Sequence, residues 1–180
     1  MKIKLFRTIG TAAFAILMMA TYTQISVFAQ DNSGDVKNDE QKQEDLSSRR
    51  ENARRLEGSW NNQGTRLNCQ TGAVIGTFQA MLTFSRGNTM WDAGTQISPA
   101  LRSPSNGVWY YEGGRFYESA FQFFRFNADG TLAGRQIVRQ RIELSRDGNS
   151  YSATATAQVL DVNGNVIQNN CSSGIGTRFE

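Results

Sequence analysis

Apolar and polar residues alternate with a period of two along most of the chain from Leu56 to Glu180. In the segment 149–161, Tyr151, Ala153, Ala155, Ala157 and Val159 share one face, and the other face carries hydroxyl and amide side chains. Such alternation is typical of strands with one buried face. Together with aromatic and β-branched residues, it predicts eight strands, at 56–66, 77–85, 88–94, 107–112, 115–127, 131–145, 149–161 and 166–179.

Turn sequences rich in Gly, Asn and Asp separate the later strands, at Glu112–Arg115, Asn127–Gly130, Asp147–Asn149 and Asn163–Gly164. These residues tolerate the positive φ that tight hairpins need. The last five strands are therefore predicted to form a meander. Eight such strands leave no exposed edge if they close into a ring. The predicted fold class is all-β: an eight-stranded antiparallel up-and-down barrel at 56–180, after a signal peptide and a disordered stalk.

The N-terminal segment has a different pattern. Lys2, Lys4 and Arg7 precede an uncharged, mostly apolar run from Ile9 to Ala20. Val27–Ala29 then offers small or branched residues at the expected cleavage site. This order is typical of a cleavable signal peptide, predicted at 1–29. The alternative is a membrane anchor, but polar residues interrupt the run before it reaches about 20 apolar positions. The predicted localisation is secreted or periplasmic, with no stable membrane span after cleavage.

Residues 30–55 contain few apolar side chains and no aromatic ones. Such a segment buries too little surface to offset the entropy of ordering, so a disordered polar linker is predicted. Its second half, from Asp45 to Arg55, has the composition of a fraying helix. Either a spacer or a tolerated tail would fit this segment.

Charge and cysteine content narrow the function classes. The chain has 19 basic and 16 acidic residues, and without Lys2, Lys4 and Arg7 the two counts are equal, so no nucleic-acid partner is expected. The chain has no histidine, which excludes Ser-His-Asp catalysis and histidine metal sites. In an exported chain, Cys69 and Cys171 favour one disulfide; two free thiols or a metal pair are the alternatives. We expect no metal, no cofactor and no enzymatic activity.

Gly58 and Trp60 stand on the first predicted strand and Arg178 on the last. A G-x-W motif with an arginine on the last strand resembles the signature of the lipocalin-like, or calycin, superfamily. The resemblance implies that Arg178 packs across Trp60 and closes one end of the barrel, where Gly58 permits close approach. The stretch Gly58–Thr65 also resembles the first strand of avidin-like biotin binders, although the rest of their ligand pattern is not evident. Asn68–Gly72 and Phe126–Thr131 resemble segments of small secreted bacterial proteins, which implies no activity.

Candidate ligand contacts follow from the barrel prediction. Inward alanines in 149–161 either leave space at the axis or are covered by larger neighbours. The connection from Thr95 to Asn106 is apolar for a loop, and either closes the barrel as a lid or packs outside it. The predicted lumen or mouth residues are Trp109, Tyr111, Phe121, Phe123, Tyr151 and Ala155.

The leading hypothesis is a non-enzymatic barrel that binds a small apolar or amphipathic ligand in its lumen. The second is an envelope or extracellular interaction protein whose barrel is filled. A barrel isomerase or cyclase is third. The sequence does not fix the oligomeric state.

Overall fold

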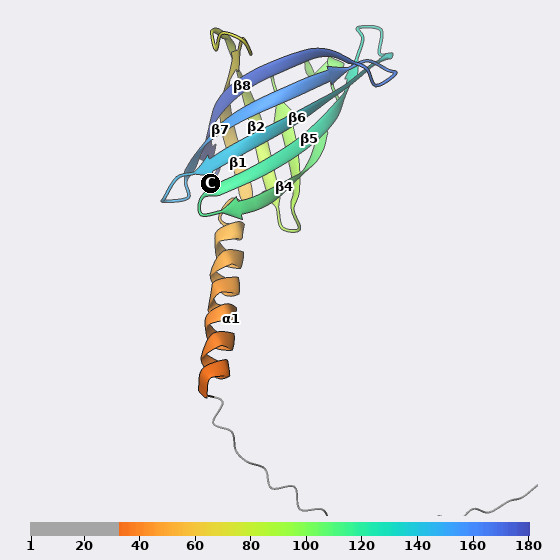
Figure 1. Ribbon diagram of the computed structural model, residues 1–180. Coiled ribbons are helices and arrows are strands. Elements are labelled where there is room, and N and C mark those ends of the chain that lie inside the picture. Colours follow the sequence, from red (N-terminus) through yellow and green to blue (C-terminus); the bar gives the residue numbers. More distant parts are fainter. Residues whose placement is uncertain (1–32) are drawn as a thin grey trace, which may run out of the picture.

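A computed structural model describes residues 33–180, and the predicted signal peptide lies outside these residues. Eight antiparallel strands close into a barrel in which each strand pairs with the next and β8 pairs with β1 (Figure 1). The strands are β1 (Gly58–Leu67), β2 (Val74–Ser85), β3 (Thr89–Gly94), β4 (Ser105–Gly113), β5 (Phe116–Phe126), β6 (Leu132–Leu144), β7 (Ser150–Leu160) and β8 (Val166–Arg178). The predicted fold class, an up-and-down antiparallel barrel, is confirmed.

Each predicted strand is present, with bounds that differ by at most a few residues. The predicted hairpin turns join β4 to β5, β5 to β6, β6 to β7 and β7 to β8. Gly130 and Gly148 have positive φ angles of 83° and 78° in two of these turns, as tight hairpins require. The longest connection runs from β3 to β4 and contains a short 3₁₀ helix, η1 (Pro99–Leu101).

The sequence predicted a disordered linker at 30–55 with the composition of a fraying helix from Asp45 to Arg55. In the structure Ser33–Arg54 form helix α1, which is longer than that. Most of its residues are Glu, Gln, Lys, Arg, Asp and Ser, several of which are good helix formers. The helix has almost no apolar face and extends away from the barrel (Figure 1). Its contact with the barrel is at its C-terminal end, where the Tyr117 hydroxyl donates to the Asn52 carbonyl at 2.5 Å. Within residues 33–180, no helix is long and apolar enough to span a bilayer.

Aromatic rings inside the barrel lie over glycines on neighbouring strands. Tyr151 pairs with Gly176 and Phe78 with Gly64. A Cβ at Gly176 would lie 2.2 Å from the Tyr151 ring, and one at Gly64 would lie 2.1 Å from the Phe78 ring. Any larger residue would displace the ring, so these glycines create the space that the aromatic core fills.

The predicted disulfide is confirmed. Cys69, in the β1–β2 connection, is bonded to Cys171 on β8, and the two are 102 residues apart in sequence. The bond ties this connection to β8, the strand that closes the barrel against β1.

Candidate functional site

One end of the barrel, which we call the closed end, is where α1 joins β1. Trp60 is 1% exposed, and its indole Nε1 donates to the Leu56 carbonyl at 3.0 Å. The Arg178 guanidinium lies 4.3 Å from the Trp60 ring and donates to the carbonyls of Glu57 and Arg55 at 2.8 and 2.7 Å. A Cβ at Gly58, whose φ is 127°, would lie 2.7 Å from Nη1 of Arg178. Gly58, Trp60 and Arg178 thus meet at this end and seal it.

Above this seal the interior is packed with aromatic and aliphatic side chains. Trp109 and Tyr117 have ring centroids 6.1 Å apart, and Tyr111 lies 5.3 Å from Tyr117. The Tyr151 ring lies 5.0 Å from the Trp60 ring. Three of the residues predicted to contact a ligand (Trp109, Tyr111 and Tyr151) therefore belong to this packed half, and Ala155 packs beside the same core.

The opposite half of the lumen holds a small cavity of about 50 Å³. Phe121 and Phe123, which the sequence also predicted as ligand contacts, line it. Polar side chains share the lining, among them Asn62, Gln136 and Gln140. Asn62 and Gln136 are buried. Polar and aromatic groups thus meet in this half, whereas the closed end is mostly apolar.

The loop at 95–104, which we call the lid loop, reaches into this cavity. Its Arg102 side chain is only 7% exposed and donates to the Asp92 carboxylate at 2.6 Å. The Arg102 guanidinium also lies 3.9 Å from the centre of the Phe123 ring. The Ser103 amide donates to the Phe124 carbonyl and the Phe124 amide donates to the Ser103 hydroxyl, which holds the loop against β5. The lid loop therefore closes the lumen by placing a charged side chain inside it.

Burial raises the pKa of the Asp92 carboxyl, and its hydrogen bond with Arg102 and the Arg102 charge oppose that rise. The Ser105 hydroxyl donates to the Asp92 backbone carbonyl at 2.8 Å, which fixes the strand that carries the carboxylate. Near the same loop, Arg125 pairs with Arg102 in an isolated bridge. The Nε of Arg125 is buried and makes no hydrogen bond with any residue that the structure describes.

Sequence reasoning did not single out Asp92, Arg102, Gln136 or Asn62 as site residues. Asp92 carried a detectable signal, because it interrupts the inward face of a predicted strand. Arg102 carried none, since a charged residue in a loop is ordinarily solvated.

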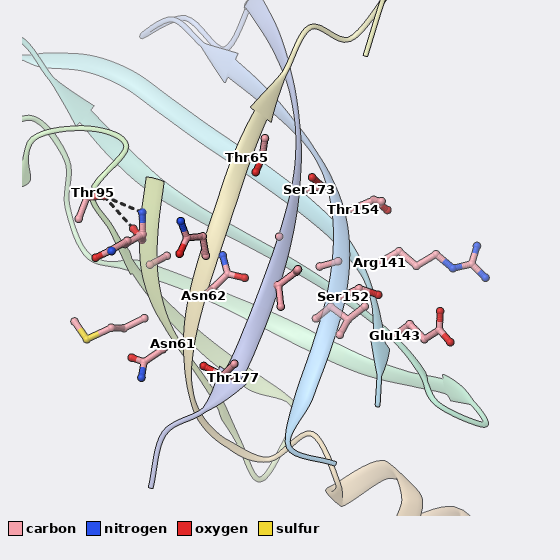
Figure 2. A pocket seen from close by; sticks show the side chains of 18 of the residues that line it. Asn61, Asn62, Thr65, Thr95, Arg141, Glu143, Ser152, Thr154, Ser173 and Thr177 are labelled. Carbon is pink, nitrogen blue, oxygen red and sulfur yellow. Dashed lines mark hydrogen bonds between the residues drawn. The ribbon is translucent and has the colours of Figure 1, made fainter. Parts of the chain in front are cut away.

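A second and much larger hollow lies outside the barrel. We call it the outer groove: it has a volume of about 1180 Å³ and crosses the outer face of β2, β1, β8 and β7, reaching β6 at one end (Figure 2). Asn61, Gln63 and Ser152 are exposed residues in its lining. Exposed Met81 and Ile175 also line it, and Arg141 and Glu143 stand at its β6 end.

The described residues contain no cluster of three or more His, Cys, Asp or Glu side chains placed to hold an ion. The buried carboxylate, Asp92, is committed to Arg102.

Comparison with known proteins gives little further information. No protein-family model matches the chain, and no curated protein matches it. Among solved structures, the chain is similar to one titled "Crystal Structure of Rv2717c from M. tuberculosis", with 14% sequence identity and a TM-score of 0.33. That match covers 70% of this chain and 94% of the other. At this score the likeness carries no argument about function.

Proposed function

We propose that this protein is an exported, non-catalytic, lipocalin-like barrel that binds a small amphipathic ligand in the lidded half of its lumen. The observation that carries the proposal is that the Arg102 side chain is buried in the lumen. Its side chain comes from a loop, not from a strand, and occupies space that the barrel wall leaves open. A cavity of about 50 Å³ has room for only a few water molecules. A larger ligand therefore has to displace Arg102.

The lining suits a ligand with one apolar and one polar part. Phe121 and Phe123 offer aromatic surface, and Gln136 offers both a donor and an acceptor. In this proposal Trp109, Tyr111, Tyr151 and Ala155 form or support the floor of the site.

Two features support the remaining parts of the proposal. The N-terminal sequence pattern is that of a signal peptide, and a disulfide is compatible with an oxidising compartment. The contact of Arg178 with Trp60 is the contact that the calycin resemblance implies.

The test is titration of the purified protein and of Arg102→Ala with a panel of fluorescent fatty-acid and retinoid analogues. We expect Arg102→Ala to bind at least one analogue more tightly than the natural sequence does, because displacing the guanidinium no longer opposes binding. Phe123→Ala in the same background should weaken that binding. If neither form binds any analogue, the lumen proposal is wrong.

That negative result would favour the rival, an interaction protein with a filled barrel. The packed half of the lumen favours this rival. So do the exposed outer aromatics Trp91, Tyr110 and Phe124, each more than half exposed.

A further inference from the structure

The outer face of four neighbouring strands carries no charge. On β1, β2, β7 and β8, the outward positions that cross the outer groove alternate with the buried ones. The outward residues of these strands that line the groove are Ser, Thr, Asn or Gln, apart from Met81 and Ile175: Asn61, Gln63, Thr65, Gln79, Met81, Ser152, Thr154, Ser173, Ile175 and Thr177. A soluble surface is ordinarily about a quarter to a third charged, so this face is unusual.

The neighbouring strand β6, which pairs with β7, provides a comparison. On β6, Arg135, Arg139, Arg141 and Glu143 point outward, and the Arg115 guanidinium pairs with Glu143 at 2.6 Å. Arg141 and Glu143 also line the β6 end of the outer groove, whereas Arg135 and Arg139 do not. The absence of charge is therefore a property of the part of the groove that lies on β2, β1, β8 and β7.

The polar groups in the groove are free to bind. Within residues 33–180, the side chains of Asn61, Gln63, Ser152 and Thr154 make no hydrogen bond to another protein group, whereas Thr95 at the groove edge is bonded to the Gln79 backbone (Figure 2). Amides and hydroxyls both donate and accept. Strand pairing places Gln79, Gln63, Ile175 and Ser152 side by side in one row across the strands. With strands about 4.8 Å apart, the row spans about 14 Å.

This chemistry excludes several partners. Nucleic acids and anionic membranes need concentrated Lys and Arg. The cores of protein interfaces are enriched in aromatic residues and Arg and depleted in Ser. A neutral ligand rich in hydroxyl groups is the class that matches donors and acceptors without charge. The exposed side chains of Met81 (65%) and Ile175 (63%) add apolar surface against which C–H groups of such a ligand can pack.

We propose that the outer groove is a binding site for a neutral polysaccharide. The chain of sugar rings would lie across β2, β1, β8 and β7, with its hydroxyls bonded to the amides and hydroxyls of Gln63, Asn61 and Ser152. This site is separate from the lumen and does not depend on the function proposed for it.

The experiment is binding of the full barrel, with its helix, to soluble neutral glycans and to charged ones. The panel contains β-1,3-glucan, xyloglucan, arabinoxylan and chitohexaose, with heparin and polygalacturonate as charged members, and binding is measured by calorimetry and affinity electrophoresis. We expect binding to at least one neutral member and to neither charged member. Because no charge takes part, affinity should change by less than about twofold between low and high salt.

Two groove variants and one matched control locate the site. Gln63→Lys and Ile175→Lys place a charge in the groove, and Gln122→Lys places the same charge on the exposed outer face of β5, paired with Asn106 and Ile137. We expect at least about a fivefold loss of affinity in the groove variants, the size of one or two lost hydrogen bonds or contacts, and no loss in the control. Gln63→Ala, which adds no bulk, should show the same loss if a lysine variant fails to fold.

Three results would overturn the proposal. One is binding to no neutral glycan. Another is equal loss in Gln122→Lys and Gln63→Lys, which would place the site elsewhere. The third is a concentration-dependent dimer that Gln63→Lys dissociates, which would make the occupant a second copy of this chain.

Discussion

The two halves of the barrel interior differ in the kinds of side chain that they bury. Around the closed end, Trp60, Tyr117 and Ile142 are at most 1% exposed and pack against other apolar side chains. In the lidded half, the buried residues include Asp92 and Gln136, and a small cavity remains. The closed end is fixed by strands and by α1, and the lidded half is completed by a loop.

This difference indicates where stability and function are separated. Apolar packing is the main source of folding free energy, and here it lies at the closed end. Buried polar groups contribute little net stability unless fully paired, and here they surround the space where a ligand would bind. Substitutions at the closed end should therefore mainly lower the free energy of unfolding. Substitutions in the lidded half should lower it less and should mainly change ligand binding.

The largest expected effect is in the packed half. Trp60→Ala should lower the free energy of unfolding by about 4 kcal/mol, because it removes a fully buried ring and leaves a cavity beneath Arg178. Phe123→Ala should cost about 3 kcal/mol, since Arg102 and the lid loop can shift into the space. Urea unfolding followed by far-UV circular dichroism measures both. If Phe123→Ala lowered the free energy of unfolding as much as Trp60→Ala or more, the distinction between the two halves would be wrong.

The sequence predicted the packed half well and the lidded half poorly. Alternation around Tyr151 and the turn at Asp147–Asn149 are local signals, so strand positions and hairpins followed from them. The pairing of Cys69 with Cys171 followed because only one intramolecular pairing exists. The contact of Asp92 with Arg102 depends on the path of the lid loop, which has no periodicity to read. The N-terminal half of helix α1 was not predicted, because a polar segment without an apolar face gives no packing signal.

The buried ion pair should behave unlike the aromatic core. Asp92→Asn leaves the Arg102 guanidinium in the lumen without its carboxylate, and should cost about 3 kcal/mol if the lid loop stays in place. The double variant Asp92→Asn with Arg102→Gln should recover most of that loss. A double-mutant cycle by urea unfolding measures the coupling.

The same cycle shows whether the Arg102 side chain is fixed in the lumen or can move out of it. If Arg102 swings into water when Asp92 is neutralised, the single variant costs much less and amide exchange in 95–104 becomes faster. If the cost of the double variant equals the sum of the costs of Asp92→Asn and Arg102→Gln, the pair is not coupled.

The disulfide should stabilise the barrel chiefly through its unfolded state. Replacing both Cys69 and Cys171 with Ser should lower the free energy of unfolding by about 3 kcal/mol, because the bond closes a long loop in the unfolded chain. Hydrogen exchange is expected to rise first in the β1–β2 connection and in β8 near Cys171, while amides beside Trp60 remain protected. Uniform loss of protection over both halves would show that the barrel opens as one unit.

The smallest effect concerns Tyr117, the polar link between the packed half and α1. Burial raises its pKa to about 12, whereas tyrosine in an unfolded chain ionises near pH 10. Between these values the unfolded chain releases a proton that the folded protein keeps, so stability falls as pH rises from about 10. Tyr117→Phe should cost about 1 kcal/mol near neutral pH, through loss of the bond to the Asn52 carbonyl, and should make the alkaline decline shallower. Some decline should remain, because burial also raises the pKa of Tyr151.

The matched control is Tyr110→Phe, which replaces an exposed tyrosine. Urea unfolding at several pH values should show that it changes neither the stability near neutral pH nor the alkaline decline. An unchanged alkaline slope in Tyr117→Phe would mean that this hydroxyl does not titrate as its burial requires.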